Sequence, residues 1–90
     1  MKTIKVLIEG TVQSVFFRTF IKENADILGV RGYVRNLPDG RVEAIFEGRD
    51  DRVMEMLKIA KAGPKHSIIR NVTSEEIRYL ALEGFKVLNL

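Results

Sequence analysis

The sequence contains no cysteine and a single histidine. The lack of cysteine excludes disulfides, a thiolate nucleophile and cysteine-ligated metal sites, and it is compatible with a reducing compartment. Near the N-terminus the longest apolar run is Val6–Ile8, which is too short for the core of a signal peptide, and no stretch approaches the length of a membrane span. We therefore expect a cytoplasmic protein with no membrane partner.

Apolar residues make up 46% of the 90 residues, enough for one compact core, and we expect a single domain over residues 1–90. Fifteen Lys and Arg residues against twelve Asp and Glu residues give a formal net charge of +3. The charges of both signs are interspersed along the chain. This small basic excess fits a small anionic substrate at least as well as a nucleic acid.

Two-residue alternation and β-branched or aromatic content predict strands or extended segments. They are expected over Lys2–Gly10, Val30–Asn36, Arg41–Glu47, part of Ile68–Tyr79, and Gly84–Leu88. The segment Leu37–Gly40 between the second and third is predicted to be a tight turn, because its proline and glycine supply the backbone angles that such a turn needs.

Apolar residues at helical spacing predict two helices. The first stripe is formed by Phe17, Ile21, Ala25 and Leu28. The second stripe is formed by Val53, Met56, Leu57 and Ala60. Gly29 is expected to follow the end of the first helix and Gly63-Pro64 to stop the second, which Asp50 or Asp51 is expected to cap.

This order of elements predicts an α+β fold, the ferredoxin-like split βαβ sandwich, with two helices on one face of a mostly antiparallel four- to five-stranded sheet. A sheet covered on one face has one apolar and one polar side. On the strand 41–47 we therefore expect Val42, Ala44 and Phe46 to be buried, and Glu43 and Glu47 to face outward. Because this fold carries enzymes, metal carriers and RNA binders, the function must come from particular residues.

The segment Gly10–Arg18 shows neither clean alternation nor a helical stripe. Consecutive backbone N–H groups in a tight loop before a helix form a concavity that binds anions. The guanidinium of Arg18 would add a planar, permanently charged fork suited to phosphate oxygens. An ordinary strand-to-helix connection with a surface arginine is the alternative.

A second segment, Gly32–Asn36, ends just before the tight turn. The amide of Asn36 can cap this turn through an Asx interaction. Alternatively it positions a water molecule, because an amide both donates and accepts hydrogen bonds without titrating.

The two segments resemble the two signature motifs of the acylphosphatase family, and the similarity runs along nearly the whole chain. Gly10–Arg18 is similar to the first motif and Gly32–Asn36 to the second, with Gly40, Val42 and Gly48 at the family's spacing. The resemblance implies a small hydrolase that cleaves acyl phosphates to a carboxylate and inorganic phosphate. It implies no metal and no other cofactor, and inorganic phosphate as both product and inhibitor.

The resemblance also implies roles for individual residues. Arg18 is expected to bind the phosphate and Asn36 to hold the attacking water. The backbone of the phosphate-binding loop is expected to help through Gln13, Ser14, Val15, Phe16, Phe17 and Arg18. The family usually has glycine where this chain has Ser14, so a catalytically weak or inactive phosphate-binding domain is an alternative.

Other polar residues have simpler explanations. His66 lies in Gly63–Ser67, a segment that is predicted to be a loop, and its side chain is expected to be solvated rather than catalytic. Asp39 is assigned to turn chemistry. Glu75 and Glu76 have no partner motif for a metal site and are expected to form a solvated face.

A competing class is an RNA- or protein-binding module on the same fold. RNA recognition by such a sheet needs exposed aromatic residues on the central strands. Phe46 is expected to be buried, which leaves Tyr33 as the aromatic residue facing outward. We therefore expect no nucleic-acid partner, and a monomer that acts on a small molecule.

Overall fold

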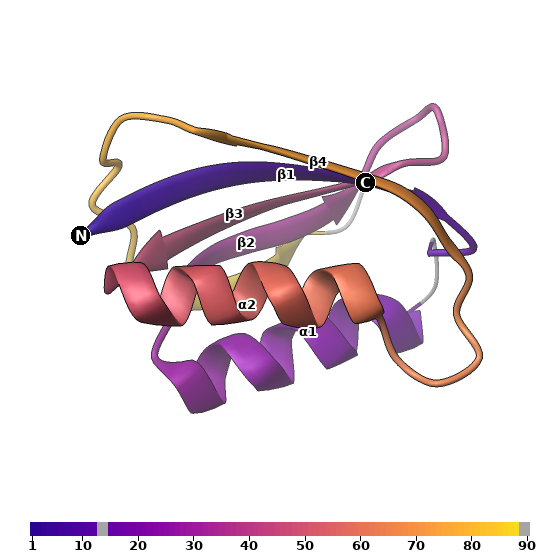
Figure 1. Cartoon of the computed structure of the whole chain (residues 1–90), viewed down its shortest axis with the longest axis horizontal. Helices are drawn as coiled ribbons and strands as arrows, with labels where there is room; N and C mark the ends of the chain where they lie inside the picture. The colour runs from indigo at the N-terminus through magenta and orange to yellow at the C-terminus, as the bar shows by residue number, and fades with distance from the viewer. Residues whose placement is uncertain (13–14, 89–90) are drawn as a thin grey trace.

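The computed structural model of the chain describes residues 1–12 and 15–88. These residues form seven elements (Figure 1). In chain order they are β1 (Lys2–Gly10), α1 (Val15–Leu28), β2 (Arg31–Asn36), β3 (Val42–Gly48), α2 (Asp50–Ala62), β4 (Ile69–Glu76) and β5 (Phe85–Leu88).

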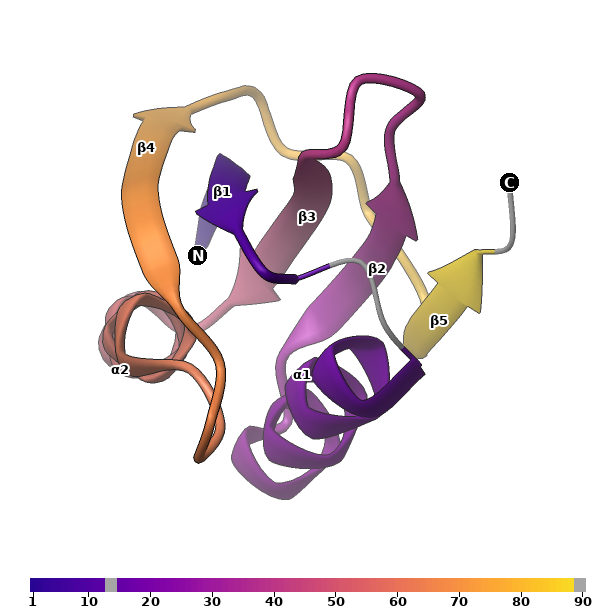
Figure 2. The ribbon, with the colours of Figure 1, turned by 90° about the vertical axis from the view of Figure 1, so that its right-hand side faces the viewer.

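The strands form one sheet in the order β4-β1-β3-β2-β5. The neighbours are antiparallel except for β2 and β5, which are parallel. Both helices lie side by side on one face of this sheet (Figures 1 and 2). The predicted ferredoxin-like arrangement is confirmed, with five strands in a mostly antiparallel sheet.

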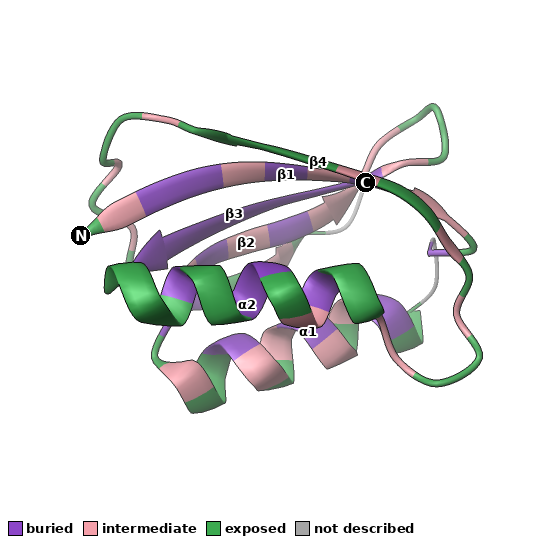
Figure 3. Ribbon diagram, viewed as in Figure 1, coloured by how far each residue is buried: buried purple, intermediate pink, exposed green. Residues whose placement is uncertain are grey.

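The core lies between the helices and the sheet (Figure 3). Both predicted apolar stripes face it, except that Leu28 is only half-buried at the end of α1. From the sheet, Phe46 is fully buried, and its ring centroid lies 6.1 Å from that of Phe85 on β5. Within the described ranges, no helix combines the length and the apolar character needed to cross a membrane.

The elements differ from the sequence predictions in small ways. β2 begins one residue later than predicted, and β3 is shifted by one residue toward the C-terminus. The predicted cap of α2 is wrong, because Arg49 is the residue before the helix and makes no side-chain capping bond. Asp50 and Asp51 lie instead in the first turn, where a carboxylate still interacts favourably with the helix dipole.

The outer face of β3 is a larger correction. We expected Glu43 and Glu47 to face solvent, but their side chains are buried, and every residue of β3 is buried. Glu43 is covered by its own partners Lys5, Tyr33 and Arg35. Glu47 is covered by residues 77–84, which connect β4 to β5. Backbone N–H groups of Leu80 and Leu82 donate to the Glu47 carboxylate at 2.6 Å, so this segment covers the strand from outside.

Candidate active site

The start of the first motif is tied to the start of β4. A Cβ atom at Gly10 would lie 1.9 Å from the carbonyl oxygen of Ile68, so only glycine fits at this position. Thr11 N–H donates to the same oxygen at 2.9 Å, and the Thr11 hydroxyl accepts from Ile68 N–H at 2.8 Å. The loop therefore leaves β1 in a fixed direction.

Two apolar residues of the motif anchor the loop in the core. Val12 and Phe17 are buried, whereas the side chains of Val15 and Phe16 are 60% and 80% exposed. The segment between the anchors contains Gln13 and Ser14, two predicted phosphate-binding residues that lie outside the described residues. The residues on either side of these two are therefore fixed by packing in the core.

Arg18 lies in the first turn of α1 and is half-buried. The N-terminus of a helix carries a partial positive charge and directs N–H groups outward, so it attracts anions. This first turn contains no acidic residue. Arg18 and the N-terminus of α1 therefore both contribute positive charge, and no carboxylate within that turn would compete with an anionic substrate for it.

Asn36 is the last residue of β2 and pairs with Val42 of β3. Since side chains alternate along a strand, Asn36 points to the same face as Val34, which is buried in the core below the helices. Arg35 points to the other face, where its Nε donates to Glu43 at 2.9 Å. The Asn36 Oδ1 atom is buried and accepts no hydrogen bond from the described part of the chain.

The turn after β2 does not use Asn36. It is closed by Leu37 N–H to the Arg41 carbonyl at 2.8 Å. Asp39 fills the Asx role instead, because its carboxylate accepts the Arg41 backbone N–H at 3.0 Å and the Arg41 Nε at 2.9 Å. The assignment of Asp39 to turn chemistry is confirmed. In the described part of the chain, the Asn36 Oδ1 accepts no hydrogen bond that would support the Asx alternative.

The sheet register brings the two motifs to one edge. Ile8 of β1 and Asn36 of β2 both pair with Val42, so they lie in one row across the sheet. The loop that leads to Arg18 starts just beyond this row. Figure 2 looks onto this edge, where the chain leaves β1, α1 begins and β2 ends. Arg18 and Asn36, distant in sequence, are therefore placed at the same end of the molecule.

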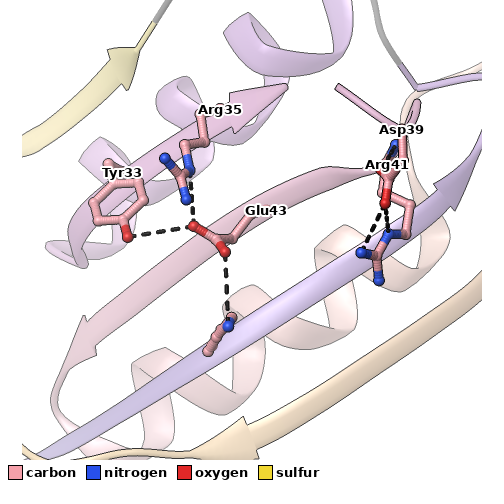
Figure 4. Close-up of polar contacts among 6 residues, drawn as sticks. Tyr33, Arg35, Asp39, Arg41 and Glu43 are labelled. Carbon is pink, nitrogen blue, oxygen red and sulfur yellow. Dashed lines mark hydrogen bonds and ion pairs between the residues drawn. The ribbon is translucent and has the colours of Figure 1, made fainter. Parts of the chain in front are cut away.

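Figure 4 shows two groups of polar contacts, one around Glu43 on the outer face of the sheet and one between Asp39 and Arg41 in the turn after β2. Burial, followed by the negative charge of Glu43, raises the pKa of Tyr33 above its ordinary value. Hydrogen bonds from Arg41 lower the pKa of Asp39 below its ordinary value. Tyr33 therefore stays neutral and Asp39 stays ionised near neutral pH, so neither supplies a proton donor that titrates there.

His66 lies in the loop after α2, where it is exposed and has a backbone φ of 74°. No hydrogen bond or ion pair connects it to Arg18 or Asn36 in the described residues. Over the same residues, no group of three His, Cys, Asp or Glu side chains is close enough to hold a metal ion. Glu75 and Glu76 are exposed, as predicted.

Sequence reasoning missed two features that support the site and the fold. The hydrogen bonds between Thr11 and Ile68 hold the start of the loop. These two residues are 57 positions apart in the sequence, so no local pattern predicts the bonds. The burial of Glu47 was missed because a glutamate in an alternating strand is normally solvated. The role of Glu47 as a buried acceptor becomes visible only when residues 77–84 are seen to donate hydrogen bonds to it.

Known proteins resemble the chain in sequence and in structure. The acylphosphatase family model matches residues 4–87. An acylphosphatase from Methanocella arvoryzae is 42% identical over 87 residues, which cover 97% of this chain and 99% of that protein. Another from Rubrobacter xylanophilus is 49% identical over 75 residues, covering 83% and 68%.

The crystal structure of acylphosphatase from Bacillus subtilis superposes with a TM-score of 0.92 at 30% identity, covering 98% of this chain and 99% of that one. Family, curated relatives and fold agree over nearly the whole length, and they support a hydrolase of acyl phosphates. The chain therefore belongs to the acylphosphatase family.

Proposed function

We propose that the chain cleaves acyl phosphates by direct attack of a water molecule on phosphorus, with Asn36 positioning the water. Arg18 and the backbone N–H groups of residues 13–18 hold the phosphate. The new bond joins the water oxygen to phosphorus. The bond between phosphorus and the acyl oxygen breaks, and its electron pair leaves with the carboxylate. The proton of the attacking water passes to the phosphate or to solvent.

The demands of this reaction match what Arg18 and the helix end offer. A carboxylate is a good leaving group, so little covalent help or proton donation is required. Phosphoryl transfer then depends mainly on positioning and on stabilising charge on the equatorial oxygens. A guanidinium beside a helix N-terminus supplies preorganised donors for that charge.

The assignment of the attacking water to Asn36 rests on one observation about its side-chain oxygen, Oδ1. A buried polar atom without a partner is rare in proteins and calls for a ligand or a water molecule. Among the described residues, the Oδ1 of Asn36 is such an atom, and Asn36 ends β2 at the end of the molecule where α1 begins. A neutral amide can orient a neutral water without titrating.

The direct attack is tested with water labelled with oxygen-18. Attack on phosphorus places the label in inorganic phosphate, whereas attack on the acyl carbon places it in the carboxylate. Hydrolysis of benzoyl phosphate, followed by its ultraviolet absorbance, supplies the products. Label recovered in benzoate would overturn the proposal.

The division of roles is tested by two variants. Arg18→Ala is expected to lower kcat by about 10²–10³ and to weaken inhibition by inorganic phosphate, because a charge-stabilising donor is lost. Asn36→Ala is expected to lower kcat by about 10² with phosphate inhibition nearly unchanged, because only the water is misplaced. Arg35→Ala is the matched control, since Arg35 faces away from the site, and it should stay near the parent. Equal, large losses of phosphate affinity in Arg18→Ala and Asn36→Ala would contradict these roles.

We further propose a monomer that acts in the cytoplasm and binds no nucleic acid. The small net charge of +3 and the buried ring of Phe46 support the last point. The lack of cysteine supports a reducing compartment. Sedimentation of the purified protein tests the monomer, and titration with labelled RNA at low salt tests the absence of binding.

A further inference from the structure

A cavity of about 410 Å³ lies beside the first turn of α1. Its walls come from Thr11, Phe16 and Phe17 on one side and from residues 64–67, the loop between α2 and β4, on the other. This volume lies within the range of about 300–1,000 Å³ that small-molecule sites occupy. The proposed chemistry has so far used only the phosphate, so this cavity has no assigned occupant.

The walls of the cavity suit an apolar group. The Phe16 ring is 80% exposed, although the neighbouring Phe17 is buried in the core. Among the described residues no acidic side chain lines the cavity, so a substrate that carries negative charge meets no carboxylate of theirs there. His66, at its rim, has a backbone φ of 74°, a conformation that non-glycine residues seldom adopt outside functional or strained sites.

The position of the cavity fits the direction of the reaction. In phosphoryl transfer the attacking and leaving oxygens lie roughly in line on opposite sides of phosphorus. Asn36 ends β2, whereas the cavity lies toward β1 and β4, on the other side of β3 in the sheet order. In Figure 2 the end of β2 and the loop between α2 and β4 lie on opposite sides of the chain where it leaves β1. With the phosphate held at the start of α1, as proposed above, a leaving group opposite the water would point toward the cavity.

We propose that this cavity holds the acyl group of the substrate and that it favours acyl phosphates with an aromatic or longer aliphatic body over acetyl phosphate. The inference rests on the proposed function, because it takes the phosphate to lie at the start of α1. Contacts with the acyl body are the same before and during the reaction. Their effect should therefore fall on KM more than on kcat.

The test compares acetyl, butanoyl and benzoyl phosphates on the parent protein. A buried methylene contributes roughly a factor of three to four in affinity, so butanoyl phosphate, with two more methylenes, should show a KM up to about nine- to sixteenfold below that of acetyl phosphate. Phe16→Ala should lower the ratio of kcat/KM for benzoyl to acetyl phosphate by at least about fivefold, because the ring's apolar contact is lost. This ratio cancels any change in phosphate binding that both substrates share.

Val15→Ala is the matched control, because Val15 is the exposed apolar neighbour of Phe16 in the same turn and does not line the cavity. Its benzoyl-to-acetyl ratio should equal that of the parent. His66→Gly is a second variant that does not disturb α1, since glycine accepts a φ of 74° without strain. It should lower the ratio by about two- to threefold. Ala81→Gly, between β4 and β5 at a φ of 56°, makes the same kind of backbone change away from the cavity and should leave the ratio unchanged.

The outcomes separate the two proposals. If the parent hydrolyses all three substrates but the ratio is the same in Phe16→Ala, His66→Gly and their controls, the cavity does not hold the acyl group and the proposed function stands. If KM does not fall with acyl size in the parent, the inference is likewise overturned. A parent protein that hydrolyses none of the substrates would refute the proposed function and this inference together.

Discussion

Glu47 is fully buried, and its carboxylate accepts three hydrogen bonds of 2.6 Å. One comes from the Thr3 hydroxyl, and two come from the backbone N–H groups of Leu80 and Leu82. Arg31 adds an ion pair at 3.8 Å. Burial alone would raise the pKa of Glu47, but the hydrogen bonds and the Arg31 charge outweigh it, and the pKa lies below its ordinary value. The group is therefore ionised in the folded protein.

Glu47→Gln keeps the shape of the side chain but replaces one oxygen with an NH₂ group. Leu80 donates to one oxygen and Leu82 to the other, so either orientation of the amide leaves one backbone N–H facing a second donor. An unsatisfied buried donor costs about 1–3 kcal/mol, and bonds to a neutral acceptor are weaker by about 1 kcal/mol each than bonds to a charged one. We expect the free energy of unfolding to fall by about 3 kcal/mol and Tm by about 15 °C.

The expected loss depends on pH. The folded pKa of Glu47 is lowered, so its contribution is fully present above the unfolded pKa of about 4.3 and is lost as the pH falls through the folded pKa. Glutamine does not titrate. The stability gap between the parent and Glu47→Gln should therefore be constant from about pH 7 to pH 5 and should narrow below about pH 4.3.

Urea unfolding at each pH measures this gap. Glu43→Gln is the matched control on the same strand and face, because its partners Lys5 and Arg35 are more than a third exposed and can be hydrated instead. It should cost about 1 kcal/mol. Activity of folded Glu47→Gln should equal that of the parent, since Glu47 pairs with Thr3, far along β1 from the row of Asn36. A loss below about 0.5 kcal/mol, or a gap that persists unchanged at pH 3, would refute the reasoning.

Three further predictions concern the site. Gly10→Ala should lose more than about 3 kcal/mol of stability, because its Cβ would lie 1.9 Å from the Ile68 carbonyl oxygen. Gly40→Ala, which has open space around it, should lose only about 1 kcal/mol in the same urea unfolding experiment, and equal losses would speak against the close approach. EDTA should leave benzoyl phosphate hydrolysis unchanged, and activity that vanished with EDTA and returned with magnesium would contradict a mechanism without metal. Ser14→Gly should raise kcat or lower the Ki of inorganic phosphate, because the family usually has glycine there. Unchanged or worse values of both would show that serine is accommodated.

Local sequence patterns were enough to predict the order of the elements, the apolar stripes of both helices and the family. These features are local, because helical and strand periodicity and motif spacing depend on neighbours along the chain. The turn at Asp39 was likewise predictable, since its carboxylate bonds only two residues away. The two motifs also predicted that Arg18 and Asn36 act together, although they did not show how these residues come to lie at the same end of the molecule.

The positions of these groups relative to one another depend instead on contacts that form when the chain folds. Ile8 and Asn36 both pair with Val42, so Asn36 lies at the end of the sheet where the loop to Arg18 begins. Strand pairing thus joins residues that are distant in sequence. The burial of Glu47 depends on a segment more than thirty residues away, which covers β3 from outside and reverses the polarity that alternation predicts. The cavity beside Phe16 exists because the loop between α2 and β4 packs next to α1. Such contacts arise from strand pairing and from the packing of loops against helices and strands, so they cannot be predicted from a short stretch of sequence.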